Sequence, residues 1–580
     1  MNGLLPIELD TSRVSFTIKV NGAPIPNTIP VYSLSVHNEA NRIPAAYISM
    51  ADGDASTADW PVSSEDIFVP GNEIEILAGY HGIEESIFKG IVTRHSLRMR
   101  RQKTELQVEC RHKAVLMTIG RNSQLFEEVK DSDIASTLLD TYGLTGSIED
   151  TTVTHAEMVQ YDCTDWDFLI SRAEAVGAVI IAKEDKMDMQ KPAVESTAAA
   201  TLRFGTNLVE FDAEIDGCQQ YGGIKAQSWD PAAQELLEAE ANDPGWVTPG
   251  NLDPAELGAA SGTATYTLRQ PGHLTEAEVQ QWADARLLRS RMAFVCGRAR
   301  VQGFATALPG ITVALEGLGT HFNGNGWVSG VRHEISNSNW LIDLQLGMPA
   351  RLHTESFKTQ TTAAAALLPG INGLHTAVVT ALEGDPDSEA RIRVKIPSIS
   401  PDGDGSRARV ATLDAGDKRG SFFLPEIGDE VVVGFLNDDP RQAVVLGALN
   451  SSAKAPPLTA ADDNHEKGFF TRSGMRILFN DDKKSITIDT PAGNVVLLDE
   501  DKGEISLTDK DGNKLVLSSD GITLDSAKDI VLKAAGNIKM ESKMALEAKA
   551  GTQLKAEGSA GAELKSSGQT VVKGGMVQIN

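Results

Sequence analysis

The repeat that decides the fold of this chain lies in its C-terminal segment. Residues 520–580 have the sequence DGITLDSAKDIVLKAAGNIKMESKMALEAKAGTQLKAEGSAGAELKSSGQTVVKGGMVQIN. Apolar residues separated by one position recur here every eight residues, with small and polar residues between them. The pairs are Ile522 and Leu524, Ile530 and Leu532, Ile538 and Met540, Leu546 and Ala548, and Leu554 and Ala556, followed more weakly by Ala562 and Leu564, and Thr570 and Val572. Apolar residues at i and i+2 point to one face of a strand, and a fixed short period is typical of stacked identical units.

A single copy of this repeat cannot bury its own apolar residues. About seven octads with about two inward side chains each, at roughly 1.5 kcal/mol per side chain, give about 20 kcal/mol. Ordering about sixty residues costs more, at about 1–2 kcal/mol each. Three chains wound around one axis would cover every pair and hydrogen-bond every strand edge, so we predict an intertwined trimeric β-helix, or prism, as a needle over residues 466–580. The predicted core residues of this trimer are Ile522, Leu524, Ile530, Leu532, Ile538, Met540, Leu546, Leu554, Leu564 and Val572.

A helix is the competing interpretation of the same segment. Residues 543–550 (KMALEAKA) are good helix formers. However, glycines recur throughout the segment, and a period of eight matches neither the 3.6 of a helix nor the 3.5 of a coiled coil. The pattern therefore favours β structure over a helix, and a helix over disorder.

Length and composition exclude several classes of protein. A chain of 580 residues has room for three or more domains. The net charge of −27 argues against nucleic acid and anionic membrane surfaces as direct partners. The four cysteines are widely spaced and are expected to be buried free thiols, as in a protein that folds in a reducing cytosol. Neither a signal-peptide pattern nor an apolar run of 18 residues is visible, which predicts synthesis in the cytoplasm without a signal peptide or membrane span.

The segment before the needle divides into two predicted domains. Residues 1–365 are expected to form a β-rich domain, beginning with the alternating strand 14–20 and an Asn-Gly turn. Three helices interrupt it, at about 133–142, 164–177 and 275–293, each with a cap signal. Residues 229–262 are rich in Asp, Glu, Pro, Gly and Ala and are predicted to be an exposed insertion. Residues 370–450 are predicted to form a five-stranded OB-type barrel. Its expected strands are His375–Ala381, Arg391–Ile396, Arg407–Thr412, Glu430–Phe435 and Ala443–Leu446.

Two neighbouring motifs in the predicted barrel resemble a known family. Residues 425–435 (PEIGDEVVVGF) and 438–447 (DDPRQAVVLG) are similar to the VgrG spike proteins of type VI secretion and to the spikes of phage tails and extracellular contractile injection particles. Residues 164–169 (TDWDFL) resemble the hub segment of that family. The resemblance implies a mainly β chain with a tail-hub-like domain of two tube-like β-barrels plus helical insertions, an OB-fold barrel and the needle.

The same resemblance implies the partners. A homotrimer would link a tail tube protein and baseplate components to a PAAR-type tip protein, and would contact the target membrane transiently when the sheath contracts. The resemblance also implies a particle that is released extracellularly or delivered into target cells and that can carry effectors. The strand alternation continues to Asn580, and three such ends would leave an open β edge. We therefore expect the tip protein to contact Met576, Val577 and Ile579.

The sequence predicts no catalytic residues, no metal site and no cofactor. It contains no GxSxG, GxxxxGK[ST] or GxGxxG motif. His333 and Glu334 begin like HExxH, but Asn337 replaces the second histidine, so His333 is expected to be exposed at a strand end. Residues 509–513 (DKDGN) have the start of a calcium loop without its closing Glu, which favours a hairpin turn. Residues 450–469 are too few to hold an enzymatic domain.

Two other functions compete with a structural spike. One is a delivered enzyme with a site in residues 229–262, which the low aromatic and histidine content of that segment disfavours. The other is a trimeric adhesin like a tail fibre. Fibres usually end in a globular receptor domain, whereas this sequence ends in octads.

Overall fold

The computed structural model describes residues 13–101, 103–260, 262 and 264–579. It divides into two compact units: one extends to Ile371 and includes Asn437–Pro440, and the other holds Asn372–Leu436 and the chain from Arg441 onwards. The first twelve residues of the predicted hub, and Asn580 of the predicted needle, lie outside the described residues. Both units consist mainly of β-strands, so the predicted fold class is confirmed.

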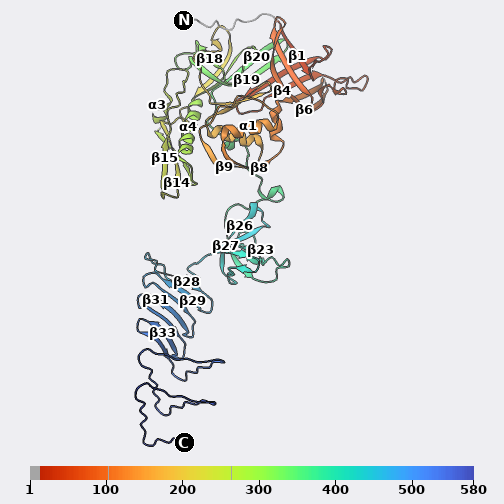
Figure 1. Cartoon of the computed structure of the whole chain (residues 1–580). Helices are drawn as coiled ribbons and strands as arrows, with labels where there is room; N and C mark the ends of the chain where they lie inside the picture. The colour runs from red at the N-terminus through yellow and green to blue at the C-terminus, as the bar shows by residue number, and fades with distance from the viewer. Residues whose placement is uncertain (1–12, 102, 261, 263, 580) are drawn as a thin grey trace. The chain divides into compact units, whose positions relative to one another are not determined.

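A sheet of 13 strands is the frame of the first unit (Figure 1). Its strands follow the order β13-β17-β20-β19-β3-β4-β7-β6-β5-β1-β2, and β18 pairs with both β19 and β12. In chain order they are β1 (Val14–Val20), β2 (Ala23–Pro24), β3 (Val31–Glu39), β4 (Ala45–Ala51), β5 (Glu73–Tyr80), β6 (Ile83–Arg100), β7 (Lys103–Arg111), β12 (Ala200–Arg203), β13 (Leu208–Ile215), β17 (Val295–Gln302), β18 (Thr312–Glu316), β19 (Gly324–Ser336) and β20 (Asn339–Leu346). Alternating apolar residues such as Leu34 and Val36 point into one continuous core.

The two halves of this sheet meet at one strand pair. Antiparallel pairing of β3 with β19 joins the strands before Arg111 to those after Ala200, from Gly330↔Glu39 to Ser336↔Ser33. In Figure 1 the red strands of the first half and the green strands of the second lie on the two sides of this junction. These strands thus belong to a single sheet with a shared core, and the two tube-like barrels that the family resemblance implies stay a prediction.

Two helices and two hairpins form a separate layer of the first unit. Here α1 (Asp131–Thr141) and α2 (Asp165–Ala175) pack together beside the β8–β9 hairpin, around Ile134, Leu169 and Ile170. The Thr164 hydroxyl accepts a hydrogen bond from the Asp167 amide at 3.0 Å, which caps α2 as predicted. The hairpins are β8 (Asn122–Lys130) with β9 (Thr154–Cys163), and β10 (Val179–Lys183) with β11 (Lys186–Gln190).

The described residues of the predicted insertion, 229–262, are mostly exposed, as predicted, and they also contain two elements that were not predicted. These are β15 (Glu235–Glu240) and α3 (Pro254–Ala260), and β15 lies in a sheet with β14 (Gly223–Asp230) and β16 (Thr265–Gln270). This sheet packs against α4 (Glu276–Met292) through Ile224, Leu268 and Val279. The acidic composition is compatible with a strand because only alternate residues of β15 face α4, and the others are free to be Glu. The α4 capping box, Thr275 with Glu278, is as predicted.

His333 and the cysteines also differ from the predictions. His333 lies inside β19 and is 3% exposed, because the chain reverses only at Asn337 and Ser338, whose φ angles are 52° and 65°. Burial lowers the pKa of His333 to about 4, and its Nδ1 accepts the indole N–H of Trp340 at 3.3 Å. All four cysteines are free, but only Cys110 is buried and Cys218 is exposed. A lone cysteine in a polar loop carries no sequence signal for burial.

The second unit begins with the predicted barrel. Five strands close in the order β21-β22-β23-β27-β26, as an OB-type barrel requires. They are β21 (His375–Ala381), β22 (Ile392–Lys395), β23 (Ser406–Val410), β26 (Glu430–Phe435) and β27 (Ala443–Ala448), with a small β24–β25 hairpin (Ala415–Gly416, Arg419–Gly420) between β23 and β26. Val431 and Val433 alternate into its core with Ile392 and Val394.

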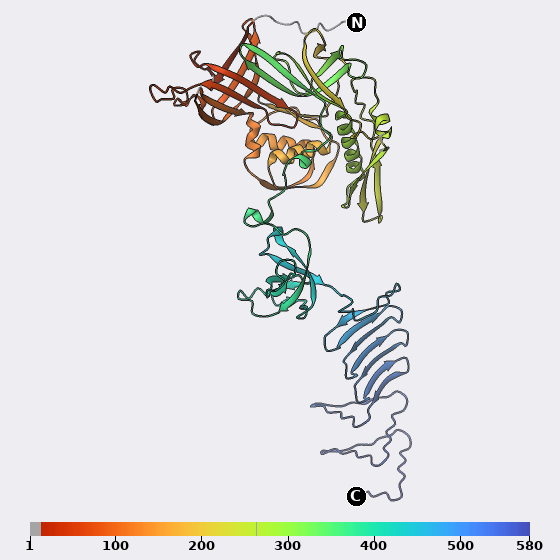
Figure 2. The same cartoon turned by 180° about the vertical axis from the view of Figure 1, so that it is seen from behind.

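After the barrel, seven strands of five residues each form an antiparallel meander (Figure 2). They are β28 (Glu466–Phe470), β29 (Arg476–Asn480), β30 (Ser485–Asp489), β31 (Val495–Asp499), β32 (Glu504–Thr508), β33 (Lys514–Ser518) and β34 (Gly521–Asp525). The remaining short helices are α5 (His353–Ser356) and the 3-10 turns η1 (Asp66–Phe68), η2 (Lys113–Thr118), η3 (Ala363–Ala366) and η4 (Leu436–Asp438). The described helices include none that is long and apolar enough to cross a membrane.

Candidate functional site

One face of the β28–β34 meander carries two rows of apolar side chains, here called the apolar face. The pairing register aligns residues that lie at i and i+2 in each strand, so both rows point to the same side. The first row is Phe469, Ile477, Ile488, Val496, Leu507, Leu515 and Leu524. The second row is Phe479, Ile486, Leu498, Ile505, Leu517 and Ile522.

The apolar face is uncovered in the single chain. Ile505 is 47% exposed and Leu507 is 43% exposed, whereas Ser506 between them, on the opposite face, is only 8% exposed. Large apolar side chains are usually buried, so this exposure is unusual. A contiguous exposed apolar surface of this kind marks a site of protein association.

Most of this face was not predicted from the sequence. The predicted core begins at Ile522, and the structure does place Ile522 and Leu524 in the two rows. The earlier pairs begin at Ile477, Ile486, Val496, Ile505 and Leu515, at intervals of nine or ten residues, so a search for a period of eight does not find them. The signal that would have found them is the i, i+2 apolar pair itself, without a fixed interval.

The octads themselves keep the predicted period but form no strands within one chain. Among the described residues after Asp525 the backbone has neither strand nor helix, including residues 543–550. Bends recur every eight residues along the C-terminal trace, which Figures 1 and 2 draw without strand arrows. They lie at 527–528, 535–536, 543–544, 551–552, 559–560, 567–568 and 575–576. The predicted core residues from Ile530 to Val572 are all exposed and keep their trimer role as a prediction.

The glycines differ between the meander and the octads. Turns of the meander use left-handed glycines such as Gly512 at φ 90°, and the two-residue turn between β33 and β34 is followed by Gly521 at φ 116°. Of the glycines described after Gly521, none has a positive φ. Residues 526–579 form no strand pairs within the single chain, so their backbone N–H and C=O groups are available for pairing with other chains.

The predicted tip contacts lie beside the final bend. Met576 and Ile579 are almost fully exposed, and Val577 is half exposed. They make no core within the chain. Their contact with a tip protein remains a prediction.

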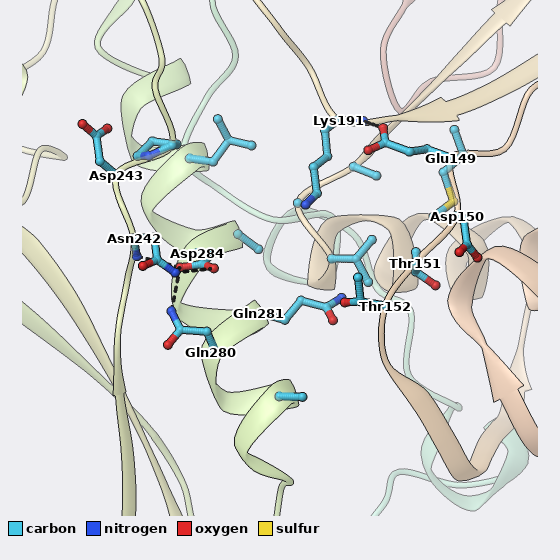
Figure 3. Close-up of a pocket in the computed structure, with 18 residues that line it drawn as sticks. Glu149, Asp150, Thr151, Thr152, Lys191, Asn242, Asp243, Gln280, Gln281 and Asp284 are labelled. Atoms are coloured by element: carbon cyan, nitrogen blue, oxygen red, sulfur yellow. Dashed lines mark hydrogen bonds between the residues drawn. The ribbon is translucent and has the colours of Figure 1, made fainter.

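A cavity of about 460 Å³ lies in the first unit, between α4 and the segment 149–152 (Figure 3). Asn242 and Asp243 of the acidic segment line it, as the competing enzyme hypothesis requires. However, Asp284 accepts hydrogen bonds from the Asn242 amide at 2.7 Å and from Gln280 at 2.9 Å, and Glu149 accepts one from the Lys191 amide at 2.8 Å. Asp284 and Glu149 thus hold loops in place.

A buried histidine lies between two carboxylates elsewhere in this unit. His155 contacts Asp131 through Nε2 and Glu278 through Nδ1, both at 3.0 Å, and Arg172 donates to Asp131 at 2.6 Å. These contacts connect α1, β9, α2 and α4. His155 and Asp131 are buried, so this hydrogen-bonded cluster holds the elements together.

The loop with a partial calcium signature is a hairpin turn. Asp509 accepts hydrogen bonds from the amides of Asp511 and Asn513 at 2.9 and 2.8 Å and from the Asn513 side chain at 2.7 Å, which lower the pKa of its carboxyl. The carboxylate therefore closes the β32–β33 turn. A search of the described residues for groups of three or more His, Cys, Asp or Glu that could hold a metal ion finds none.

Two family models match the chain. The Alg8 N-terminal domain matches residues 10–337, more than half of the chain. The type VI secretion system/phage-baseplate injector OB domain matches residues 375–449, which contain the closed barrel.

Relatives match over shorter stretches. The type VI secretion system spike protein VgrG3 of Vibrio cholerae is 32% identical over 101 residues, which are 16% of this chain and 10% of that protein. The spike protein VgrG5 of Pseudomonas aeruginosa is 31% identical over 128 residues, 20% of this chain and 16% of that protein. The chain thus spans a small part of the length of these relatives. The 43 kDa tail protein of prophage MuSo2 from Shewanella oneidensis is similar in structure at a TM-score of 0.44, with 12% identity over 58% of this chain and 99% of that one.

Proposed function

The chain belongs to the family of the Alg8 N-terminal domain and carries an injector OB domain, and from this premise we propose that it is the structural spike of a contractile, phage-like injection system. In this role it transmits force and catalyses no reaction. The similarity of the chain to VgrG spike proteins supports the same role.

The observation that carries the proposal is the uncovered apolar face. Its two rows run without a polar interruption from β29 to β34 and lead into the octads, which have the same i, i+2 pairs. Three copies around one axis would bury these rows against one another and would pair the free backbone of residues 526–579. The result is a stiff needle, which is what a piercing element needs.

The partners follow from the same role. The trimeric first unit would seat on a tail tube protein and on baseplate components, and Met576, Val577 and Ile579 would receive a PAAR-type tip protein. When a sheath contracts, the needle would be pushed through the target envelope and would contact the membrane only in passing. With a net charge of −27, the chain is poorly suited to stable binding of nucleic acid or of anionic lipid.

The proposed structural role is in keeping with the contacts of the polar groups in the first unit. Asp284 and Glu149 in the Figure 3 cavity accept hydrogen bonds from loop groups, and the buried His155 lies between Asp131 and Glu278. Residues 449–465 connect the barrel to the meander.

The mass of the purified protein in solution tests the proposal. Light scattering at micromolar concentration should give three times the chain mass of 62.0 kDa. Leu524→Asp, on the apolar face, should weaken the trimer, whereas the matched Thr523→Asp, on the opposite face of the same strand, should not. A stable monomer, or equal effects of the two substitutions, would refute the proposed needle. Electron micrographs should show a broad head with one central needle.

A further inference from the structure

We propose that the loop joining β23 to β26, residues 411–429 and here called the barrel loop, packs against the needle of a neighbouring copy of this chain. The inference rests on the proposed function, because it requires the trimer. It adds a second interface, made by the barrel, which the octad pattern does not predict.

The barrel loop exposes an unusual amount of apolar surface. Leu413 is 91% exposed, Phe422 79%, Phe423 67% and Ile427 64%. These four large side chains lie within 15 residues of one another in the sequence. An exposed apolar cluster of this density marks a contact surface and not a solvent-facing loop.

The loop's own hydrogen bonds hold it in shape. The Asp414 carbonyl accepts the Ser421 amide at 2.9 Å, the Asp414 carboxylate accepts Arg419 at 2.9 Å, and the short strands β24 and β25 pair inside the loop. The apolar side chains are therefore presented to the outside by a fixed backbone and do not fold back onto the barrel. A surface that is ordered before association loses little conformational entropy when it binds.

The loop continues the apolar face. The ring of Phe423 stacks on the ring of Phe469, with centroids 5.6 Å apart and an angle of 16° between the planes. Phe469 is the first residue of the first apolar row, and Arg472 of the following turn donates to Glu426 of the loop at 2.9 Å. The copies that cover the apolar face must reach Phe469, and they then meet the barrel loop beside it. For this reason the occupant is a second copy and not a separate protein.

Photo-crosslinking of the full-length protein tests this contact. A benzoylphenylalanine at position 422 should, after irradiation, give covalent dimers and trimers on a denaturing gel. The linked peptide should come from residues 466–489 of another chain. The matched control carries the same group at Ile399, which is exposed on a different loop of the same barrel, and should give no interchain product. In a second measurement, the double variant Leu413→Ser, Phe422→Ser should raise the dissociation constant of the trimer about 10-fold or more relative to Ile399→Ser.

The outcomes separate this inference from the proposed function. A trimer whose position 422 links only to its own chain, or to nothing, overturns the contact and leaves the spike intact. A trimer in which position 422 is captured only by an added tip or baseplate protein also overturns it. A monomeric protein would refute the proposed function, and the inference with it.

Discussion

Replacing Ile505 by Asp should dissociate the trimer, and the structure gives the size of the effect. Ile505 is 47% exposed in the single chain. Full burial of an isoleucine contributes about 1.5–3 kcal/mol, so covering the exposed half contributes about 1 kcal/mol per chain and about 3 kcal/mol per trimer. The substitution also brings three carboxylates close to one axis without partners, and each buried unpaired charge costs several kcal/mol more.

Sedimentation over a range of protein concentrations would measure the dissociation constant of the trimer. The Ile505→Asn variant is the uncharged control. The Asn variant loses the apolar contribution alone, so its trimer should be weakened at every pH. In the Asp variant, burial and the neighbouring carboxylates raise the pKa of the new carboxyl above its usual value of about 4. The charge penalty is full above that raised pKa and disappears as the pH falls through it, so acidification should restore the Asp trimer towards the Asn level. An Asp variant that stays trimeric at neutral pH with unchanged affinity would refute the shared axis.

Three further predictions concern the tip, the chemistry and the hub. Deleting residues 571–580 should abolish co-purification of a tip protein and leave the trimer intact; unchanged binding would place the docking face elsewhere. Peptidoglycan and ester hydrolysis by the pure trimer should stay at background, and turnover that a point mutation removes would contradict the structural role. Burial lowers the pKa of His333 from 6.5 to about 4, so only the unfolded chain takes up this proton as the pH falls from 6.5 towards 4. Hub stability should therefore drop by about 2 kcal/mol between pH 7 and pH 5 from His333 alone. His112, whose pKa burial also lowers to about 4, should add to this loss. Chemical denaturation of His333→Gln should show a shallower pH dependence; an unchanged slope would mean that His333 does not contribute.

The sequence correctly predicted the strands and the helix start that are determined by residues close together in the chain. The strand Val14–Val20 and the barrel strands His375–Ala381 and Glu430–Phe435 have the predicted bounds, because each alternates apolar and polar residues between clear turns. Helix α4 begins where its capping box places it, after Thr275. Such signals act over a few residues and need no knowledge of the tertiary fold.

The failures share a physical cause, since each depended on a distant neighbour. His333 is buried because Trp340 and the core lie against it. The residues next to His333 in the sequence do not predict that burial. The acidic β15 is a strand because β14 supplies its hydrogen bonds. The octads are the extreme case: their period was predicted from the sequence, and the single chain shows only bends at that period. In the proposed trimer their strand partners would lie in other chains.

The bends at every eighth residue from 527 to 576 also bear on how such needles can evolve. Duplicating one whole octad lengthens the needle by one step, leaves every later apolar pair facing the same way, and requires no change in the hub or the barrel. An insertion whose length is not a multiple of eight would shift all later pairs out of line at once. The length of the needle can therefore differ among related proteins in steps of one octad, through slippage during replication of the gene. The residues of the hub and the barrel stay under separate selection.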